Sequence, residues 1–333
     1  TLLGGLLQLL VQIPSLRRVG FHFKPNFHWN DPGVRRVLIL TIPGIIAASA
    51  VQINVLISSG FASYIGTEAV TWLNSAFRIM QLPIGVFGVA VATITLPVIS
   101  RIAATKDSSQ FGITLGQAMR FVVFLTLPVA VGFWFFAKPI ISLIYEHGKF
   151  YAEDSAQTAF ALQFYAVGLV AYSCIKVLSP GFYAINKKWT PMCISFMSIF
   201  INITLTYYLV FTVEMGHRGL ALSTAVSAII NFLTLYFLMN RLHDLQTKKF
   251  LNAFIRCGVA SAALGIFCWV FTHSFSESIY NSSFSLRIFL LLTAILLAGI
   301  IYLSFCLLLK VENAYSIIKI LIQKIQPKGM VIE

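Results

Sequence analysis

Charged residues are scarce in this 333-residue chain: they make up 11% of it, whereas 58% of the residues are hydrophobic. A soluble domain of this size needs far more polar surface to cover its core, so a soluble globular fold is excluded. Helices of about 20 apolar residues cross the roughly 30 Å hydrocarbon core of a bilayer. Eight stretches reach that length, at residues 34–61, 69–100, 112–136, 157–185, 190–213, 219–240, 251–273 and 286–309. The sequence therefore predicts an all-α integral membrane protein, a polytopic helical bundle.

Motifs for metal binding, nucleotide binding and catalysis are absent from the sequence. The five cysteines lie within apolar stretches and without metal-type spacing, as small buried side chains do. The six histidines form no HExxH or nucleophile-elbow pattern, and the chain has no P-loop. We therefore predict no metal site, no cofactor and no enzymatic activity.

Acidic residues are missing from the middle of every predicted span. All eleven carboxylates lie in connectors or at span ends, whereas two cations, Arg78 and Lys176, lie deep within apolar segments. A cation at the bilayer centre costs roughly 2.5–3.5 kcal/mol on insertion scales, so it faces protein, water or a bound anion. An anionic substrate is therefore our leading hypothesis for these two residues. The alternative is structural, with either cation hydrogen-bonded to carbonyls or hydroxyls at a helix contact or kink.

A polar stripe accompanies Arg78 along its span. Asn74, Arg78 and Gln81 follow one another at spacings of four and three, which places them on one face of an α-helix. Gln52 and Asn54 add amides at mid-depth in the first predicted span. We predict that these side chains hydrogen-bond a substrate. Close helix packing through the small residues of the same face is the alternative.

The net charge of +13 does not indicate nucleic-acid binding, because of where the basic residues lie. Most of the 24 Lys and Arg residues fall in alternate connections, near residues 17–36, 101–120, 187–188, 241–256 and 310–328. The positive-inside rule assigns those connections and both chain ends to the cytoplasm. The basic excess therefore reports topology, together with attraction to the anionic headgroups of membrane lipids.

Breaks in hydropathy divide the chain into four segments. We expect the end of a preceding span and a cytoplasmic connector in residues 1–33, because the chain opens on an apolar run at Thr1. Six spans in 34–242, a final helix pair in 243–310 and a cytoplasmic C-terminal tail in 311–333 follow.

Prolines interrupt the first six spans. A membrane helix bends at Pro because a backbone carbonyl loses its partner. We predict hinges or kinks at Pro43, Pro83, Pro97 and Pro180. Ordinary helix packing is the alternative.

Several short stretches resemble the MurJ (MviN) family of lipid II flippases, within the superfamily of multidrug, oligosaccharidyl-lipid and polysaccharide exporters. They are spread over about residues 1–240 and are specific in combination. The stretches are Asp31–Arg36, Pro43-Gly44, Gln52–Asn54, Arg78–Pro83 with Gly85 and Gly88, Leu96-Pro97, Gly148–Phe150, Lys176–Tyr183, Thr190-Pro191 and Gly219–Ser223.

The resemblance implies two six-helix lobes that face each other across a central cationic cavity, and a final helix pair that makes a groove for a polyprenyl tail. Residues 34–242 then correspond to the second lobe, and the N-terminal lobe of the same protein is missing. Arg78 matches the family arginine that meets the substrate diphosphate, and Lys176 matches a family lysine. The implied activity is transport of the lipid-linked peptidoglycan precursor, lipid II, across the bacterial inner membrane by alternating access, which supports the cell wall and cell shape.

Two positions depart from the family pattern. Phe77 and Gln81 stand where the family often has acidic residues, so Arg78 lacks two charged neighbours. Two alternatives therefore accompany the lipid II flippase. One is an exporter of another lipid-linked oligosaccharide or of drugs on the same fold, and the other is a membrane scaffold without transport.

Overall fold

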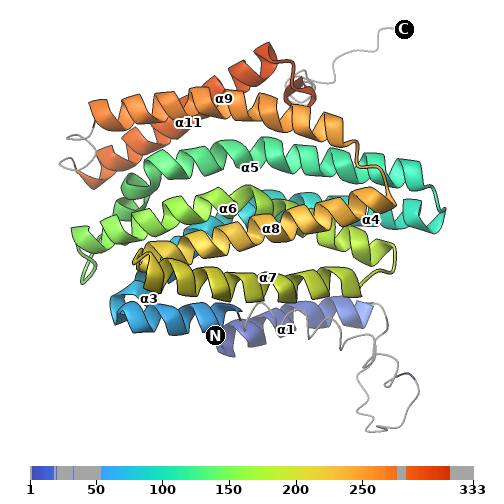
Figure 1. Ribbon diagram of the computed structural model, residues 1–333, viewed down its shortest axis with the longest axis horizontal. Coiled ribbons are helices and arrows are strands. Elements are labelled where there is room, and N and C mark those ends of the chain that lie inside the picture. Colours follow the sequence, from blue (N-terminus) through green and yellow to red (C-terminus); the bar gives the residue numbers. More distant parts are fainter. Residues whose placement is uncertain (1, 19, 21–32, 34–53, 276–282, 316–333) are drawn as a thin grey trace. The chain divides into compact units, whose positions relative to one another are not determined.

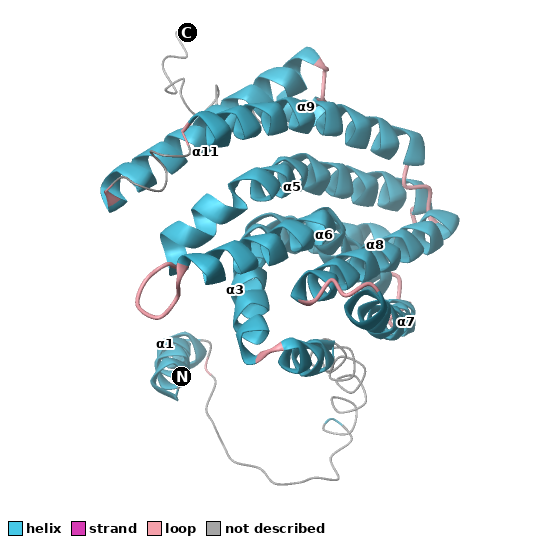
Figure 2. Cartoon of the chain, turned by 60° about the vertical axis from the view of Figure 1, so that its left-hand side comes forward, coloured by secondary structure: helices cyan, strands magenta, loops and turns pink. Residues whose placement is uncertain are grey.

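The computed structural model describes residues 2–18, 20, 33, 54–275 and 283–315. The described residues are helical apart from short connections, and none of them forms a strand (Figure 2). The chain divides into two compact units, Thr1–Ile45 and Ile46–Glu333. In the first unit, helix α1 (Leu2–Arg18) has two arginines in its last turn, where positive charge favours the helix dipole.

The second unit contains seven helices, among the described residues, that are long and apolar enough to cross a membrane. In chain order its helical segments are 54–65, α3 (Thr67–Pro83), η1 (Ile84–Val89), α4 (Ala90–Ala104), α5 (Ser108–Tyr145), α6 (Ala152–Ala184), α7 (Trp189–Tyr207), η2 (Tyr208–Thr212), α8 (His217–Leu242), α9 (Thr247–Ser274) and α11 (Phe284–Leu308). The prediction of an all-α, polytopic membrane bundle is confirmed. Most of the first predicted span, at 34–53, and with it Pro43 and Gln52, lies outside the described residues.

Local sequence explains where the two longest helices begin. The Asp107 side chain accepts a hydrogen bond of 2.9 Å from the backbone N–H of Gln110, which caps α5. At the start of α6, Asp154 accepts a bond of 2.9 Å from the backbone N–H of Tyr151. Helix α5 continues to Tyr145, whereas the predicted span ends at 136. Pro139 lies within this helix and is buried.

Helix α6 lies at the centre of the lobe, with α3, α4, α5 and α8 packed around it (Figure 1). It is the most buried of the spanning helices. Helix α7 packs on α8 at the edge. The final pair, α9 and α11, lies on the other side of α5, as Figure 1 shows. Helix α5 therefore contributes to three hydrophobic clusters, two inside the lobe and one with the final pair.

The connection 243–246, between the lobe and the final pair, lies against the first turns of α5. A Cβ atom on Gly112 would come within 2.3 Å of the Asp244 carbonyl oxygen, and one on Gly116 within 2.5 Å of the Leu245 carbonyl oxygen. Glycine is required at these two positions because a side chain would collide with backbone.

His243, in the same connection, is anchored to the start of α5. Its Nδ1 atom lies 2.7 Å from Oγ of Ser108, and its ring lies 4.6 Å from that of Phe111. Partial burial lowers the pKa of the His243 imidazole, the Ser108 contact acts in the opposite direction, and the charge of Lys187 lowers it further.

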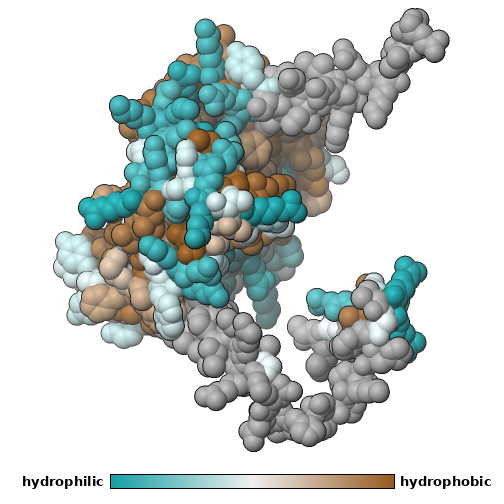
Figure 3. All heavy atoms as spheres, turned by 90° about the vertical axis from the view of Figure 1, so that its right-hand side faces the viewer, coloured by the Kyte–Doolittle hydropathy of each residue, from teal (hydrophilic) through white to brown (hydrophobic). Residues whose placement is uncertain are grey.

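Hydrophilic side chains gather at the end of this unit that carries the connections 105–107, 185–188 and 243–246 (Figure 3). Exposed basic residues at this end are Arg101, Lys106, Lys187, Lys188, Arg241, Lys248 and Lys249. The opposite end, with residues 146–154 and 214, carries four carboxylates. The described part of the chain is therefore polarised in charge along its helices.

Candidate functional site

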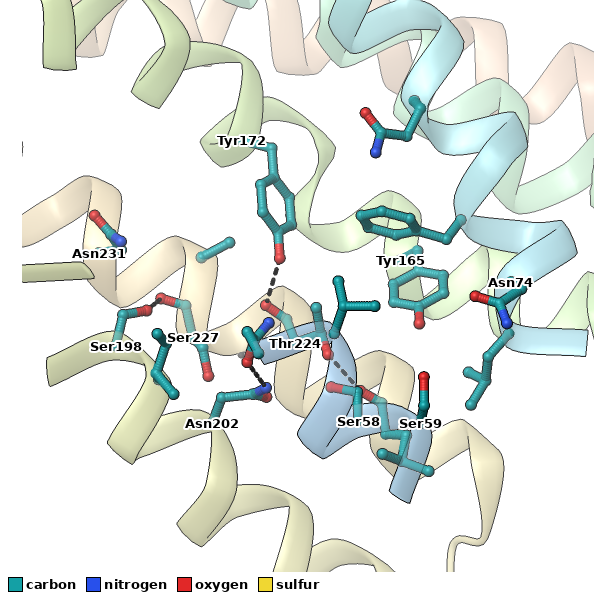
Figure 4. Close-up of a pocket in the computed structure, with 18 of the residues that line it drawn as sticks. Ser58, Ser59, Asn74, Tyr165, Tyr172, Ser198, Asn202, Thr224, Ser227 and Asn231 are labelled. Atoms are coloured by element: carbon teal, nitrogen blue, oxygen red, sulfur yellow. Dashed lines mark hydrogen bonds between the residues drawn. The ribbon is translucent and has the colours of Figure 1, made fainter. Parts of the chain in front are cut away.

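A cavity of about 270 Å³ lies inside the lobe (Figure 4). Its walls come from the helical segment 54–65 and from helices α3, α6, α7 and α8. Hydroxyl and amide side chains line much of it: Asn54, Ser58, Ser59, Asn74, Gln81, Tyr165, Tyr172, Ser195, Ser198, Asn202, Thr224, Ser227 and Asn231. Polar groups of this density in membrane-spanning helices are costly unless they bond to one another or to a ligand.

Hydrogen bonds hold the cavity walls together. Nδ2 of Asn202 on α7 donates to Oδ1 of Asn54 over 2.8 Å, which connects α7 to the segment 54–65 (Figure 4). Oγ of Ser198, also on α7, donates to the backbone carbonyl of Ser227 on α8 over 3.0 Å. The two α7 residues are four apart, so one helical face makes both connections.

A second set of bonds joins α8 to its neighbours. The Tyr172 hydroxyl on α6 donates to the Thr224 carbonyl at 3.4 Å, and the hydroxyls of Thr206 and Ser223 lie 2.7 Å apart. The polar face of α8 thus contacts both α6 and α7.

Four of the predicted binding residues line this cavity: Asn54, Asn74, Gln81 and Lys176. They come from three helical segments, so the fold brings together amides and a cation that are far apart in the sequence. Gln52 lies outside the described residues. Lys176 is exposed at the cavity, although it belongs to the most buried helix.

Arg78 occupies a different place. Its side chain is exposed and does not line the cavity, although Asn74 and Gln81, four and three residues away, both do. It makes no hydrogen bond or ion pair with any other residue of the described chain. The Arg78 side chain is therefore exposed and is not part of the cavity wall.

A π-helical segment follows the predicted polar stripe. Segment η1 (Ile84–Val89) begins directly after Pro83, and its wider turns change the angular register of the residues that follow. Gly88 then packs against Ser173 of α6, with 3.2 Å between the Cβ it lacks and the Ser173 Cα. Single π-helical turns occur frequently at functional sites, so Pro83 keeps its place as a predicted hinge. Pro97 and Pro180 lie within continuous helices, α4 and α6.

Two buried amides of the cavity, Asn202 and Asn231, escaped the sequence prediction. A signal for them exists in the sequence. Ser198, Asn202 and Thr206 repeat at spacings of four on α7, and Ser227 and Asn231 are four apart on α8. Polar residues that recur on one face of an apolar span indicate a polar helix contact or cavity.

These features define a class: a multi-pass α-helical membrane protein with a helical lobe built around a polar cavity. A family model described as lipid II flippase MurJ matches residues 1–294. The chain belongs to this family.

Individual relatives agree with that assignment. The chain is 36% identical, over 70% of its length, to the probable lipid II flippase MurJ of Vibrio cholerae, and 35% identical, over 80%, to the lipid II flippase MurJ of Burkholderia cenocepacia. It covers 44% and 53% of those relatives, so it spans about half of their length.

Solved structures show the same architecture. The chain superposes on a lipid II flippase MurJ in an inward closed conformation with a TM-score of 0.67 and 26% identity, covering 91% of this chain and 59% of the other. A multidrug resistance transporter of the MATE family, in an outward-facing conformation, matches with a TM-score of 0.55 and 15% identity, covering 84% of this chain and 67% of the other. The second likeness shows the fold alone.

Proposed function

We propose that this chain acts as the second lobe and final helix pair of a flippase that moves lipid II across the bacterial inner membrane by alternating access. Residues 34–242 form the lobe, 243–310 the final pair and 311–333 a cytoplasmic tail. An N-terminal lobe of the same protein completes the central cavity. Transport of this kind breaks no covalent bond, and membrane lipids are the other partners.

The observation that carries the proposal is the exposed guanidinium of Arg78, which has no partner among the described residues. No acidic residue lines the adjacent cavity among the described residues, so the positive charge there is not neutralised by this lobe. A diphosphate offers paired oxygens to the planar fork of an arginine, and such charge-assisted bonds are strong. Lys176 is a supporting cation of the substrate site, and Gln52, Asn54, Asn74 and Gln81 are groups that hydrogen-bond the substrate.

The charge polarity supports the orientation in the membrane. The end with the connections 105–107, 185–188 and 243–246 carries the exposed basic residues, and the positive-inside rule places such an end in the cytoplasm. Helix α11 and the described residues 309–315 end at that same end of the unit, which supports a cytoplasmic C-terminal tail.

The test is complementation by the full-length protein in bacteria depleted of their lipid II flippase. Arg78→Ala and Arg78→Lys are both expected to fail at wild-type expression levels, because lysine cannot make the paired contact. Arg101→Ala is the matched control, since Arg101 is exposed in the last turn of α4, away from the cavity, and it should rescue growth. Full rescue by Arg78→Ala would overturn the diphosphate role.

A further inference from the structure

The cavity inside the lobe contains two buried acceptors that the protein leaves unpaired. Oδ1 of Asn202 and Oδ1 of Asn231 have no hydrogen-bond partner among the described residues. The two side chains are 3% and 9% exposed, and both line the cavity. A buried carbonyl oxygen without a partner costs free energy, so a ligand that donates hydrogen bonds here recovers that cost.

The charge of the cavity favours a neutral ligand. Its described lining contains many hydroxyls and amides but no carboxylate, and Lys176 is its one cation. A bound metal cation would have no anionic ligand and would be repelled by Lys176. A fully charged anion would find a single exposed lysine, whereas the larger unpartnered cation, Arg78, lies outside.

Size and shape restrict the ligand further. A volume of about 270 Å³ lies just below the range of about 300–1,000 Å³ typical of small-molecule pockets, which matches one ring-sized group. Phe77 and Tyr165, with ring centroids 5.5 Å apart, supply an aromatic wall. An amide-bearing sugar ring has apolar C–H faces for such a wall and O–H and N–H donors at its edge for the asparagines.

We propose that the cavity is a separate subsite for one uncharged, hydrogen-bonding group of the substrate, an amide-bearing sugar ring by its chemistry, while Arg78 binds the phosphate charge outside it. The inference rests on the proposed flippase function and divides its substrate site into two. Asn202 and Asn231 accept hydrogen bonds from the neutral group, and Phe77 and Tyr165 contact its apolar face.

The experiment measures the two ligand chemistries separately on the purified full-length protein in nanodiscs. N-acetylglucosamine is the neutral probe, followed by saturation-transfer NMR, and inorganic diphosphate is the charged probe, followed by calorimetry. Asn202→Leu and Asn231→Leu keep side-chain volume but remove the acceptors. Each should weaken sugar binding at least about tenfold, the loss for a buried hydrogen bond left unmade, and leave diphosphate binding unchanged. Arg78→Ala should weaken diphosphate binding and leave sugar binding unchanged.

The matched control is Thr204→Val, which removes a hydroxyl from the exposed face of the same helix, outside the cavity. It should change neither the binding of the sugar nor the binding of diphosphate. The subsite is refuted if wild-type protein binds no sugar, if Arg78→Ala abolishes sugar binding, or if sodium competes with the sugar, which would assign the asparagines to a cation. Asn231→Leu guards against a folding defect, because the Oδ1 atom that it removes makes no hydrogen bond within the described part of the chain. Retained diphosphate binding by Arg78→Ala contradicts the proposed function instead, so the two failures are distinguishable.

Discussion

Helix α5 offers a sharp test of how the final pair is attached to the lobe. Replacement of Gly112 by alanine places a methyl group 2.3 Å from the Asp244 carbonyl oxygen, where ordinary contact begins at 3.4 Å. The connection must therefore retreat by about 1 Å, and because the colliding atom is backbone, a change of rotamer cannot relieve it. Gly132, on the same helix, has open space around it and serves as the control.

The expected changes in unfolding free energy at Gly112 and Gly132 have opposite signs. Overpacking costs about 1–3 kcal/mol, and the better helix propensity of alanine returns about 1 kcal/mol. We expect Gly112→Ala to lose up to about 2 kcal/mol of unfolding free energy and Gly132→Ala to gain up to about 1 kcal/mol. At about 2.1 cal/mol/K of unfolding entropy per residue, a difference of about 2 kcal/mol corresponds to roughly 3 °C in Tm for a chain of 333 residues.

A thiol-reactive dye provides the assay, because four of the five cysteines are buried and only Cys193 is exposed. The dye labels one site in the folded protein and five after unfolding, so fluorescence reports the transition in detergent. Equal melting temperatures for the two alanine variants would refute the contact between the connection and α5.

Two further predictions concern the ends of the helices. The folded-state pKa of His243 lies below its unfolded value of about 6.5, so the stability that its neutral form contributes is lost as the pH falls through and below about 6.5. Between about pH 7.5 and pH 5.5, the Tm of the wild type should therefore fall more steeply than that of His243→Asn, and parallel curves would contradict the prediction. At the opposite end, Nε1 of Trp72 donates to Oδ1 of Asp154 over 2.8 Å, so Trp72→Phe should cost about 1–2 kcal/mol in thermal unfolding, whereas Trp134→Phe, at a half-exposed site, should cost less.

Hydropathy predicted the membrane bundle because burial in lipid demands long apolar segments, whatever their partners. Prediction from the sequence was less accurate where tertiary contacts determine the length and the local geometry of a helix. The end of α5 was placed too early, since Lys138 and Pro139 resemble a helix end in sequence but lie within a packed helix. The π-helical turns of η1 are also invisible to a periodicity of 3.6 residues, because they alter that period itself.

The site was predicted in part. Asn54, Asn74, Gln81 and Lys176 share one cavity, as expected of polar residues within apolar spans. Sequence could not separate Arg78 from them, because a three-or-four-residue spacing fixes a helix face only to within a broad arc, and neighbouring helices decide which part of it is enclosed.

Helix α5 is a long, continuous helix that contacts both the lobe and the final pair. Its 38 residues extend over about 57 Å at 1.5 Å per residue, and the Phe124 carbonyl near its middle accepts a 2.7 Å hydrogen bond from the Tyr302 hydroxyl of α11. A tilt of about 10° over that length displaces one end relative to the other by about 10 Å. Helix α9 packs along α5, and α11 is hydrogen-bonded to it. If the lobe rocks as the proposed function requires, we therefore expect the final pair to move together with the lobe.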